Sequence, residues 1–120
     1  MPIIGLSSSK QIVVQIWYGT VASTVGPILP VGVWTHIVNS YDAANGLHLW
    51  VNGSLVNASG PFTYVPSNVP NFITLASSLN GIGGCQPGSI QVGQFYGIID
   101  ELRIYSRALN ASDVYALANP

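Results

Sequence analysis

The sequence has few charged side chains. Only 6% of its 120 residues are Asp, Glu, Lys or Arg, and the formal net charge is −1. The three basic residues, Lys10, Arg103 and Arg107, are scattered, so the chain lacks the basic patch that binds nucleic acids or anionic membranes. We therefore expect no nucleic-acid partner, and we expect Ser, Thr, Asn, Gln and Gly to provide most of the polar surface.

Long apolar runs are also absent, although the mean hydropathy is +0.42. No stretch approaches the roughly 18 apolar residues of a membrane helix, so we expect no insertion into a membrane. The start of the sequence lacks the charged and apolar regions of a signal peptide, as is typical of a mature or excised chain. The length suits one modest core, so we expect a single domain over residues 1–120, with residues 1–10 as an arm or edge strand.

The chain has one cysteine, Cys85, which excludes an internal disulfide. It lies in the glycine-rich stretch 81–88 (GIGGCQPG), whose composition predicts a loop. In an extracellular chain an odd cysteine indicates either an intermolecular disulfide or a free thiol. Both alternatives stay open for Cys85.

Alternating apolar and polar residues dominate the stretch 34–54 (WTHIVNSYDAANGLHLWVNGS). Residues 34–41 and 47–51 each alternate with a period of two, which predicts two strands. Turn residues at 42–46 connect them, and Asn52-Gly53 turns the chain again. We therefore expect an antiparallel meander here.

Other stretches have the β-branched and aromatic residues, or the alternation, of strands. They are residues 3–4, 11–18, 20–25, 54–56, 72–76 and 97–105. Residues 60–70 hold three prolines and predict a crossing loop. Asn110, with Asp113 three positions later, predicts the start of a helix of about seven residues. Many short strands with Gly and Pro turns predict an all-β antiparallel sandwich or jelly roll that ends in one short helix.

Two segments resemble a known family. Residues 34–53 resemble the W-x-H-(I/V)-x-x-x-Y-D…G-L-x-L-(Y/W)-V-N-G core of laminin G-like domains, in the concanavalin A-like lectin/glucanase superfamily. Residues 95–109 (FYGIIDELRIYSRAL) resemble its F-x-G-x-I-D-(D/E)-(V/L)-R-(I/V)-Y-x-R-x-L signature. The resemblance covers about residues 11–117 and implies a jelly roll. Complete domains of this family begin with further strands, so we expect this chain to start inside the domain and to leave a sheet edge open to strand addition.

Catalytic residues are not evident. Glucanases of this superfamily place carboxylates on one face of a strand, whereas Asp100 and Glu101 are adjacent and point to opposite faces. Asp42 and Asp113 fall at a turn and a helix start, where carboxylates act as caps. We therefore expect a protein that is not an enzyme.

Asp100 shares a strand face with the apolar residues Ile98, Leu102 and Ile104, so we expect it to be buried. A buried carboxylate needs partners, either backbone N–H groups or a Ca²⁺ ion. Both alternatives stay open, and calcium is the one cofactor that the sequence suggests. Glu101 and Arg103, on the opposite face, are expected to form a surface ion pair.

His48 and Trp50 lie on the strand face opposite Leu47, Leu49 and Val51, which predicts a less buried position. An exposed Trp beside polar neighbours stacks on sugar rings or anchors a protein partner. Trp50, His48 and Tyr41 are therefore the candidate ligand-binding residues. The alternative is that a second layer of the sandwich covers Trp50.

Asn52, Asn57 and Asn110 each begin an N-x-S sequon and are candidate glycosylation sites of a secreted protein. Asn110 also fits as the helix N-cap.

We therefore expect a non-enzymatic extracellular recognition or adhesion module, secreted or at the cell surface, that binds a glycan or an extracellular protein. The alternative is a structural subunit that self-assembles into an oligomer or filament by strand complementation. Residues 3–6 would be the donated strand, unless they fold back and complete their own sheet.

Overall fold

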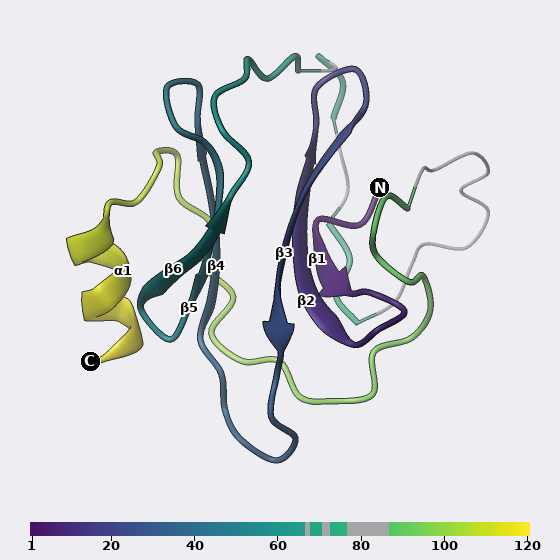
Figure 1. Cartoon of the computed structure of the whole chain (residues 1–120), viewed down its shortest axis with the longest axis vertical. Coiled ribbons are helices and arrows are strands. Elements are labelled where there is room, and N and C mark those ends of the chain that lie inside the picture. The colour runs from purple at the N-terminus through teal and green to yellow at the C-terminus, as the bar shows by residue number, and fades with distance from the viewer. Residues whose placement is uncertain (67, 71–72, 77–86) are drawn as a thin grey trace.

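The computed structural model describes residues 1–66, 68–70, 73–76 and 87–120. Two three-stranded antiparallel sheets, ordered β1-β2-β3 and β4-β5-β6, face each other (Figure 1). The elements are β1 (Ile4–Leu6), β2 (Gln11–Trp17), β3 (Val21–Ile28), β4 (Ile37–Asp42), β5 (Gly46–Val51), β6 (Ser54–Ala58) and α1 (Ala111–Ala118). The predicted fold class, an all-β antiparallel sandwich with a short C-terminal helix, is confirmed.

The first sheet uses the N-terminal residues. β1 pairs with β2, with Ile4 opposite Val14, and β2 pairs with β3, with Val13 opposite Val25. Of the two alternatives for residues 3–6, the structure has the one in which they complete their own sheet.

The second sheet is the predicted meander. The backbone N–H of Asn45 donates to Asp42 Oδ1 (2.8 Å) and closes the β4–β5 turn. Asn52 and Gly53 form the β5–β6 turn with φ of 49° and 84°, the left-handed values that these two residues accept readily.

Between the sheets lies the main core. Ile12 and Val14 of β2 meet Leu47 and Leu49 of β5, and all four side chains are buried. Each such side chain contributes about 1.5–3 kcal/mol relative to an exposed position. In β5, Leu47 and Leu49 lie on the face that the alternation predicts to be the more buried one.

A further layer lies outside each sheet. On the second sheet, α1 places Val114 against Trp50 and Leu109. On the first sheet, Ile90 is buried so close to Gly5 that a Cβ there would lie 2.6 Å from the Ile90 side chain. These covers make the outer faces of both sheets partly buried.

The helix begins as predicted. Asn110 is its N-cap, and the Asn110 side chain accepts a hydrogen bond from the backbone of Asp113. The Asp113 carboxylate in turn accepts one from the Asn110 backbone, which completes a capping box. With eight residues, the helix is far too short to cross a membrane, and the described part of the chain holds no membrane-spanning helix.

The strand predicted over residues 97–105 is wrong. None of the described residues from 61 to 110 lies in a strand, so residues 73–76 are not a strand either. A strand requires a neighbour for its N–H and C=O groups, and residues 97–105 have none among the described residues. Asp100 is consequently exposed rather than buried. Cys85 and Phe72 lie outside the described residues, so both alternatives for Cys85, an intermolecular disulfide and a free thiol, stay open.

Candidate binding site

Trp50 is covered rather than exposed. Its side chain is 6% exposed and packs against Leu109 and Val114, and its Nε1–H donates to Ser40 Oγ (2.9 Å). The expectation of an exposed Trp50 is therefore wrong, and the alternative of a covering layer is correct. The cause is helix α1, which lies over this face of the second sheet (Figure 1).

Tyr41 lies on the other face of the second sheet, against the main core. Its hydroxyl donates to the Phe62 carbonyl (2.7 Å) and accepts from the Tyr64 backbone N–H (2.6 Å). The side chain thus fastens the loop after β6 to the sandwich. Because neighbouring positions of a strand alternate, Tyr41 does not join Trp50 and His48.

His48 lies in a small hollow beside the start of α1, which we call the His48 pocket. Its ring meets the Trp50 ring edge-on at 5.9 Å. The pocket has a volume of about 240 Å³ and is lined by Ser40, Asp42, Asn45, His48, Trp50 and residues 108–111.

Most polar side chains of the His48 pocket already have hydrogen-bond partners within the protein. Asn45 Nδ2 donates to both carboxylate oxygens of Asp42 (3.1 and 3.0 Å), and these bonds hold the pKa of Asp42 below its ordinary value, with a smaller effect from His48. Ser40 accepts from Trp50, and Asn110 caps the helix. Among the described polar side chains that line the pocket, only His48 lacks a hydrogen-bond partner, so the pocket offers a ligand few free polar groups.

Asp100 does not form a metal site with its described neighbours. Its Oδ1 accepts the backbone N–H of Glu101 (2.8 Å). Within the described ranges no three His, Cys, Asp or Glu side chains are grouped to hold a metal ion. The exposed ion pair between Glu101 and Arg103 (2.6 Å) is confirmed, and calcium binding stays a prediction.

The three sequon asparagines are exposed, and each uses its side chain. Asn52 Oδ1 accepts the His36 backbone N–H (2.9 Å), and Asn57 Nδ2 donates to the Val25 carbonyl (2.9 Å). Asn110 acts as the helix cap. Their glycosylation stays a prediction.

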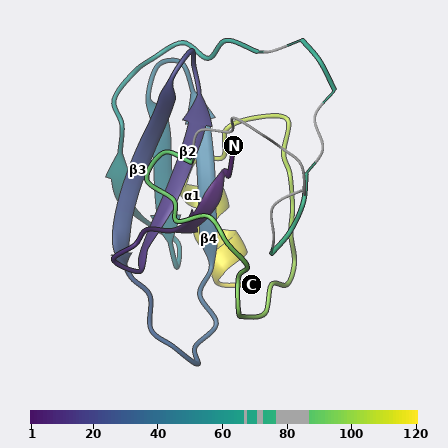
Figure 2. The same ribbon diagram turned by 90° about the vertical axis from the view of Figure 1, so that its right-hand side faces the viewer.

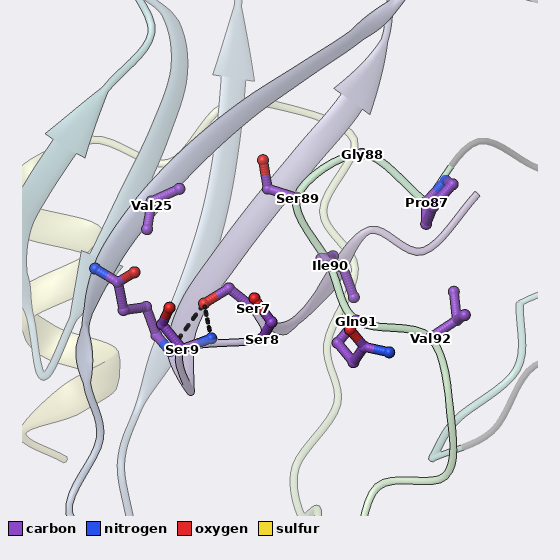
Figure 3. Close-up of a pocket in the computed structure, with 11 residues that line it drawn as sticks. Ser7, Ser8, Ser9, Val25, Pro87, Gly88, Ser89, Ile90, Gln91 and Val92 are labelled. Atoms are coloured by element: carbon purple, nitrogen blue, oxygen red, sulfur yellow. Dashed lines mark hydrogen bonds between the residues drawn. The ribbon is translucent and has the colours of Figure 1, made fainter.

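A larger hollow lies on the first sheet, and we call it the serine groove (Figure 3). The serines of the β1–β2 turn lie on one side of it and the segment 87–92 on the other. Its volume is about 530 Å³, and its lining residues are Ser7, Ser8, Ser9, Gln11, Val25, Pro87, Gly88, Ser89, Ile90, Gln91 and Val92.

Gln15, a fully buried residue of β2, fixes the segment 87–92 to the sheet. Its Nε2 donates to the carbonyls of Pro2 (2.8 Å) and Pro87 (2.7 Å), and its Oε1 accepts from Ser23 Oγ (3.0 Å) and the Ser89 N–H (3.3 Å). All four hydrogen-bonding positions of the carboxamide are thus used. The groove is therefore held by a buried group rather than by surface contacts.

Gly88 is required for this close approach. It has φ of 60°, and a Cβ there would lie 2.5 Å from Gln15 Oε1. The Gln91 N–H also donates to the Leu6 carbonyl (2.8 Å), which joins the segment to the edge strand β1.

The groove offers free polar groups and no charge. The hydroxyls of Ser8, Ser9 and Ser89 and the carboxamides of Gln11 and Gln91 have no hydrogen-bond partner among the described residues. Ser7 differs, because its Oγ accepts the N–H groups of Ser9 and Gln11 (3.2 Å each) and shapes the turn. Val25, Ile90 and Val92 add apolar surface.

The sequence did not reveal the serine groove. The feature that could have indicated it is the run of three serines before Lys10. Serine is common in turns, so this run alone does not indicate a binding site. The groove depends on contacts between the N-terminal strands and residues 87–91, far along the chain, and Gln15 makes most of the hydrogen bonds among them.

Comparison with known proteins agrees with this architecture. Residues 1–115 match the family model of a laminin G-like domain described as the concanavalin A-like lectin/glucanases superfamily. No curated protein matches the chain. A crystal structure of an S-layer domain-containing protein from Clostridium thermocellum is similar, with 23% sequence identity and a TM-score of 0.55. The match covers 91% of this chain and 52% of that one, so the chain spans about half of that structure, and the likeness shows the fold. The resemblance seen in the sequence is confirmed, and the chain belongs to the concanavalin A-like lectin/glucanases superfamily.

Proposed function

We propose that this chain is a non-enzymatic recognition module, outside the cell or at its surface, that binds a neutral glycan in the serine groove. The observation that carries the proposal is a set of five polar side chains around one uncharged hollow, none of which has a hydrogen-bond partner in the described part of the chain. The family supports a binding module for carbohydrate or protein.

The chemistry of the groove suits sugar hydroxyls. A sugar hydroxyl both donates and accepts hydrogen bonds, and so do serine hydroxyls and glutamine carboxamides. The apolar side chains of Val25, Ile90 and Val92 provide contact for the C–H groups of a sugar ring. The volume of about 530 Å³ falls within the range of roughly 300–1,000 Å³ that is usual for ligand sites.

The absence of charge in the lining favours a neutral ligand and binding without catalysis. None of the lining residues is Asp, Glu, Lys, Arg or His. An acidic or basic glycan would lose solvation without gaining an ion pair. Glycoside hydrolysis ordinarily uses two carboxylates, and the groove supplies neither.

The test is a glycan array with the double variant Ser89→Ala/Gln91→Ala. Each lost hydrogen bond costs about 0.5–1.5 kcal/mol, so two together should weaken binding of a neutral glycan about tenfold. The matched control is Ser106→Ala/Gln94→Ala, which changes the same residue types at exposed positions that do not line the groove.

Unchanged binding in the groove variant would contradict the proposal. Loss of binding in His48→Ala, with the groove variant intact, would move the site to the His48 pocket. In that case the sequence-based expectation for His48 would hold.

A second candidate function is a structural subunit that self-assembles. Large apolar side chains between residues 92 and 105 are exposed, and such patches ordinarily mark interaction sites. The similar solved structure comes from an S-layer domain-containing protein, which supports a place in a surface assembly. Light scattering tests this function directly, because a stable monomer of 12.7 kDa would contradict it.

A further inference from the structure

Residues 95–105 (FYGIIDELRIY), which we call the signature segment, expose apolar side chains to an unusual degree. Ile98 is 78% exposed and Leu102 is 53% exposed, and Tyr96 and Ile104 are also exposed. A single exposed apolar side chain needs no explanation. Several exposed apolar side chains along one segment indicate that a binding partner is missing.

The backbone of the segment is paired only at its start among the described residues, where the Phe95 N–H donates to the Ala76 carbonyl (2.8 Å). No backbone hydrogen bond joins residues 97–105 to another part of the described chain. Figure 2 shows this part of the chain, in yellow-green, as a trace beside the two sheets rather than within them. Its alternation nevertheless suits a strand, with Ile98, Leu102 and Ile104 on one face.

The charges of the segment are self-complementary. Glu101 and Arg103 stand two positions apart, with Leu102 between them. When two copies of the segment run antiparallel with Leu102 facing Leu102, each Glu101 lies opposite Arg103 of the other copy. Opposite charges in directly facing cross-strand positions stabilise a sheet, and like charges destabilise it.

The same charges exclude the neighbouring registers. In a two-fold symmetric antiparallel pair, the axis passes through one residue, which faces its own copy. Because side chains alternate between the two faces of a strand, a change of register moves the axis to a neighbouring residue. A centre at Glu101 or at Arg103 places two like charges face to face. Of these three centres, only the one at Leu102 gives two ion pairs.

We propose that a second copy of this chain covers the signature segment, and that the two copies pair antiparallel about a two-fold axis at Leu102. The proposal rests on the second candidate function, self-assembly. It names the segment that pairs and the residues that face each other across the interface. The interface is isologous, since the same residues serve on both sides. Ile99 then faces Tyr105 of the second copy.

One residue must change conformation on pairing. Glu101 has φ of 55°, a left-handed value that is unfavourable for a residue with a Cβ. Pairing moves it into the extended region, so the unpaired segment holds an unfavourable conformation that the pair releases.

Charge reversal tests the register. In sedimentation velocity at low salt, Glu101→Arg and Arg103→Glu should each weaken self-association at least tenfold, because each creates two like-charged contacts. An equimolar mixture of these two variants should associate again, since it restores two opposite-charge contacts across the interface. The double variant Glu101→Arg/Arg103→Glu should also associate by itself.

The matched control is Lys10→Glu, a charge reversal on the β1–β2 turn that should leave association unchanged. All charge-reversed residues are exposed, so circular dichroism should show unchanged folding. Recovery of self-association in the mixture is the decisive result. If the charges acted only within one chain, adding the second variant would not restore association.

Three results would overturn the proposal, and they separate it from the function on which it rests. A monomeric parent chain would reject both. An assembling parent whose reversals have no effect would keep self-assembly and reject this interface. Reversals that weaken assembly without recovery in the mixture would show that the charges act within one chain.

Discussion

Strand β5 and the signature segment have the same alternation and opposite surroundings. In β5, Leu49 is fully buried between the sheets, whereas Leu102 in the signature segment is 53% exposed. β5 has β4 on one side and β6 on the other, and the signature segment has no neighbouring strand in the described part of the chain. Alternation therefore indicates that a segment suits a sheet, and its neighbours decide whether it joins one.

The difference follows from the backbone. Each N–H and C=O group that leaves water needs a hydrogen-bond partner, so an apolar strand cannot bury its side chains without one. The same leucine contributes to stability in one segment and not in the other.

The largest effect should come from Leu49→Ala. It removes buried methyl groups from the main core, so the free energy of unfolding should fall by about 2–5 kcal/mol. Leu102→Ala makes the same chemical change at an exposed position and should alter the free energy of unfolding by less than about 0.5 kcal/mol. Urea denaturation of both variants measures the difference.

Equal losses in the two variants would break the comparison, because they would place Leu102 in a core. At protein concentrations where the chain self-associates, Leu102→Ala should weaken association without lowering monomer stability.

A smaller loss should come from Gln15→Ala, which tests the cover of the first sheet. The variant leaves the carbonyls of Pro2 and Pro87 without their buried donor, which costs about 1–3 kcal/mol. It should also release the segment 87–92 and weaken glycan binding. Thermal unfolding and the glycan array measure the two effects.

Gln94→Ala is the matched control for Gln15→Ala, since Gln94 is an exposed glutamine close to the same segment. Full stability of Gln15→Ala would mean that the buried carboxamide does not hold the groove.

The sequence predicted those features whose causes are local. Asn52-Gly53 sets the β5–β6 turn by its own backbone preferences, and Asn110 with Asp113 sets the helix start by a capping box. The inward face of β5, with Leu47 and Leu49, likewise follows from alternation alone.

Features that depend on distant contacts were not predictable in this way. Trp50 is buried because α1 packs on its face of the sheet, and the serine groove exists because Gln15 holds residues 87–89. Period-two alternation identifies two faces of a strand and does not say which later segment covers one of them. The expected exposure of Trp50 was therefore wrong, although the fold was correct. Ligand binding by Trp50, His48 and Tyr41 stays a prediction.

The smallest effect concerns helix α1, which covers the second sheet, and the pH dependence of the stability that Asp113 contributes at its start. A hydrogen bond from Arg107 (2.7 Å) is the main cause that lowers the pKa of Asp113, and the Asn110 backbone adds to it. The ionised Asp113 is thus favoured in the folded state. Its contribution to stability is present above the pKa of an unfolded aspartate, about 3.9, and is lost as the pH falls through the lower folded pKa.

Arg107→Gln removes the main cause, so the pKa of Asp113 should rise toward its ordinary value. The acid-induced fall in melting temperature that Asp113 causes should then be smaller and should end at a higher pH, and the change is small because this partly exposed pair is screened by salt. NMR titration of the Asp113 carboxyl measures the pKa directly. Asp42 is an internal control, because Asn45 rather than an arginine lowers its pKa, so its titration should not change. An unchanged Asp113 titration in Arg107→Gln would show that the capping box alone holds the carboxylate, and that the cover of the second sheet does not depend on the ion pair.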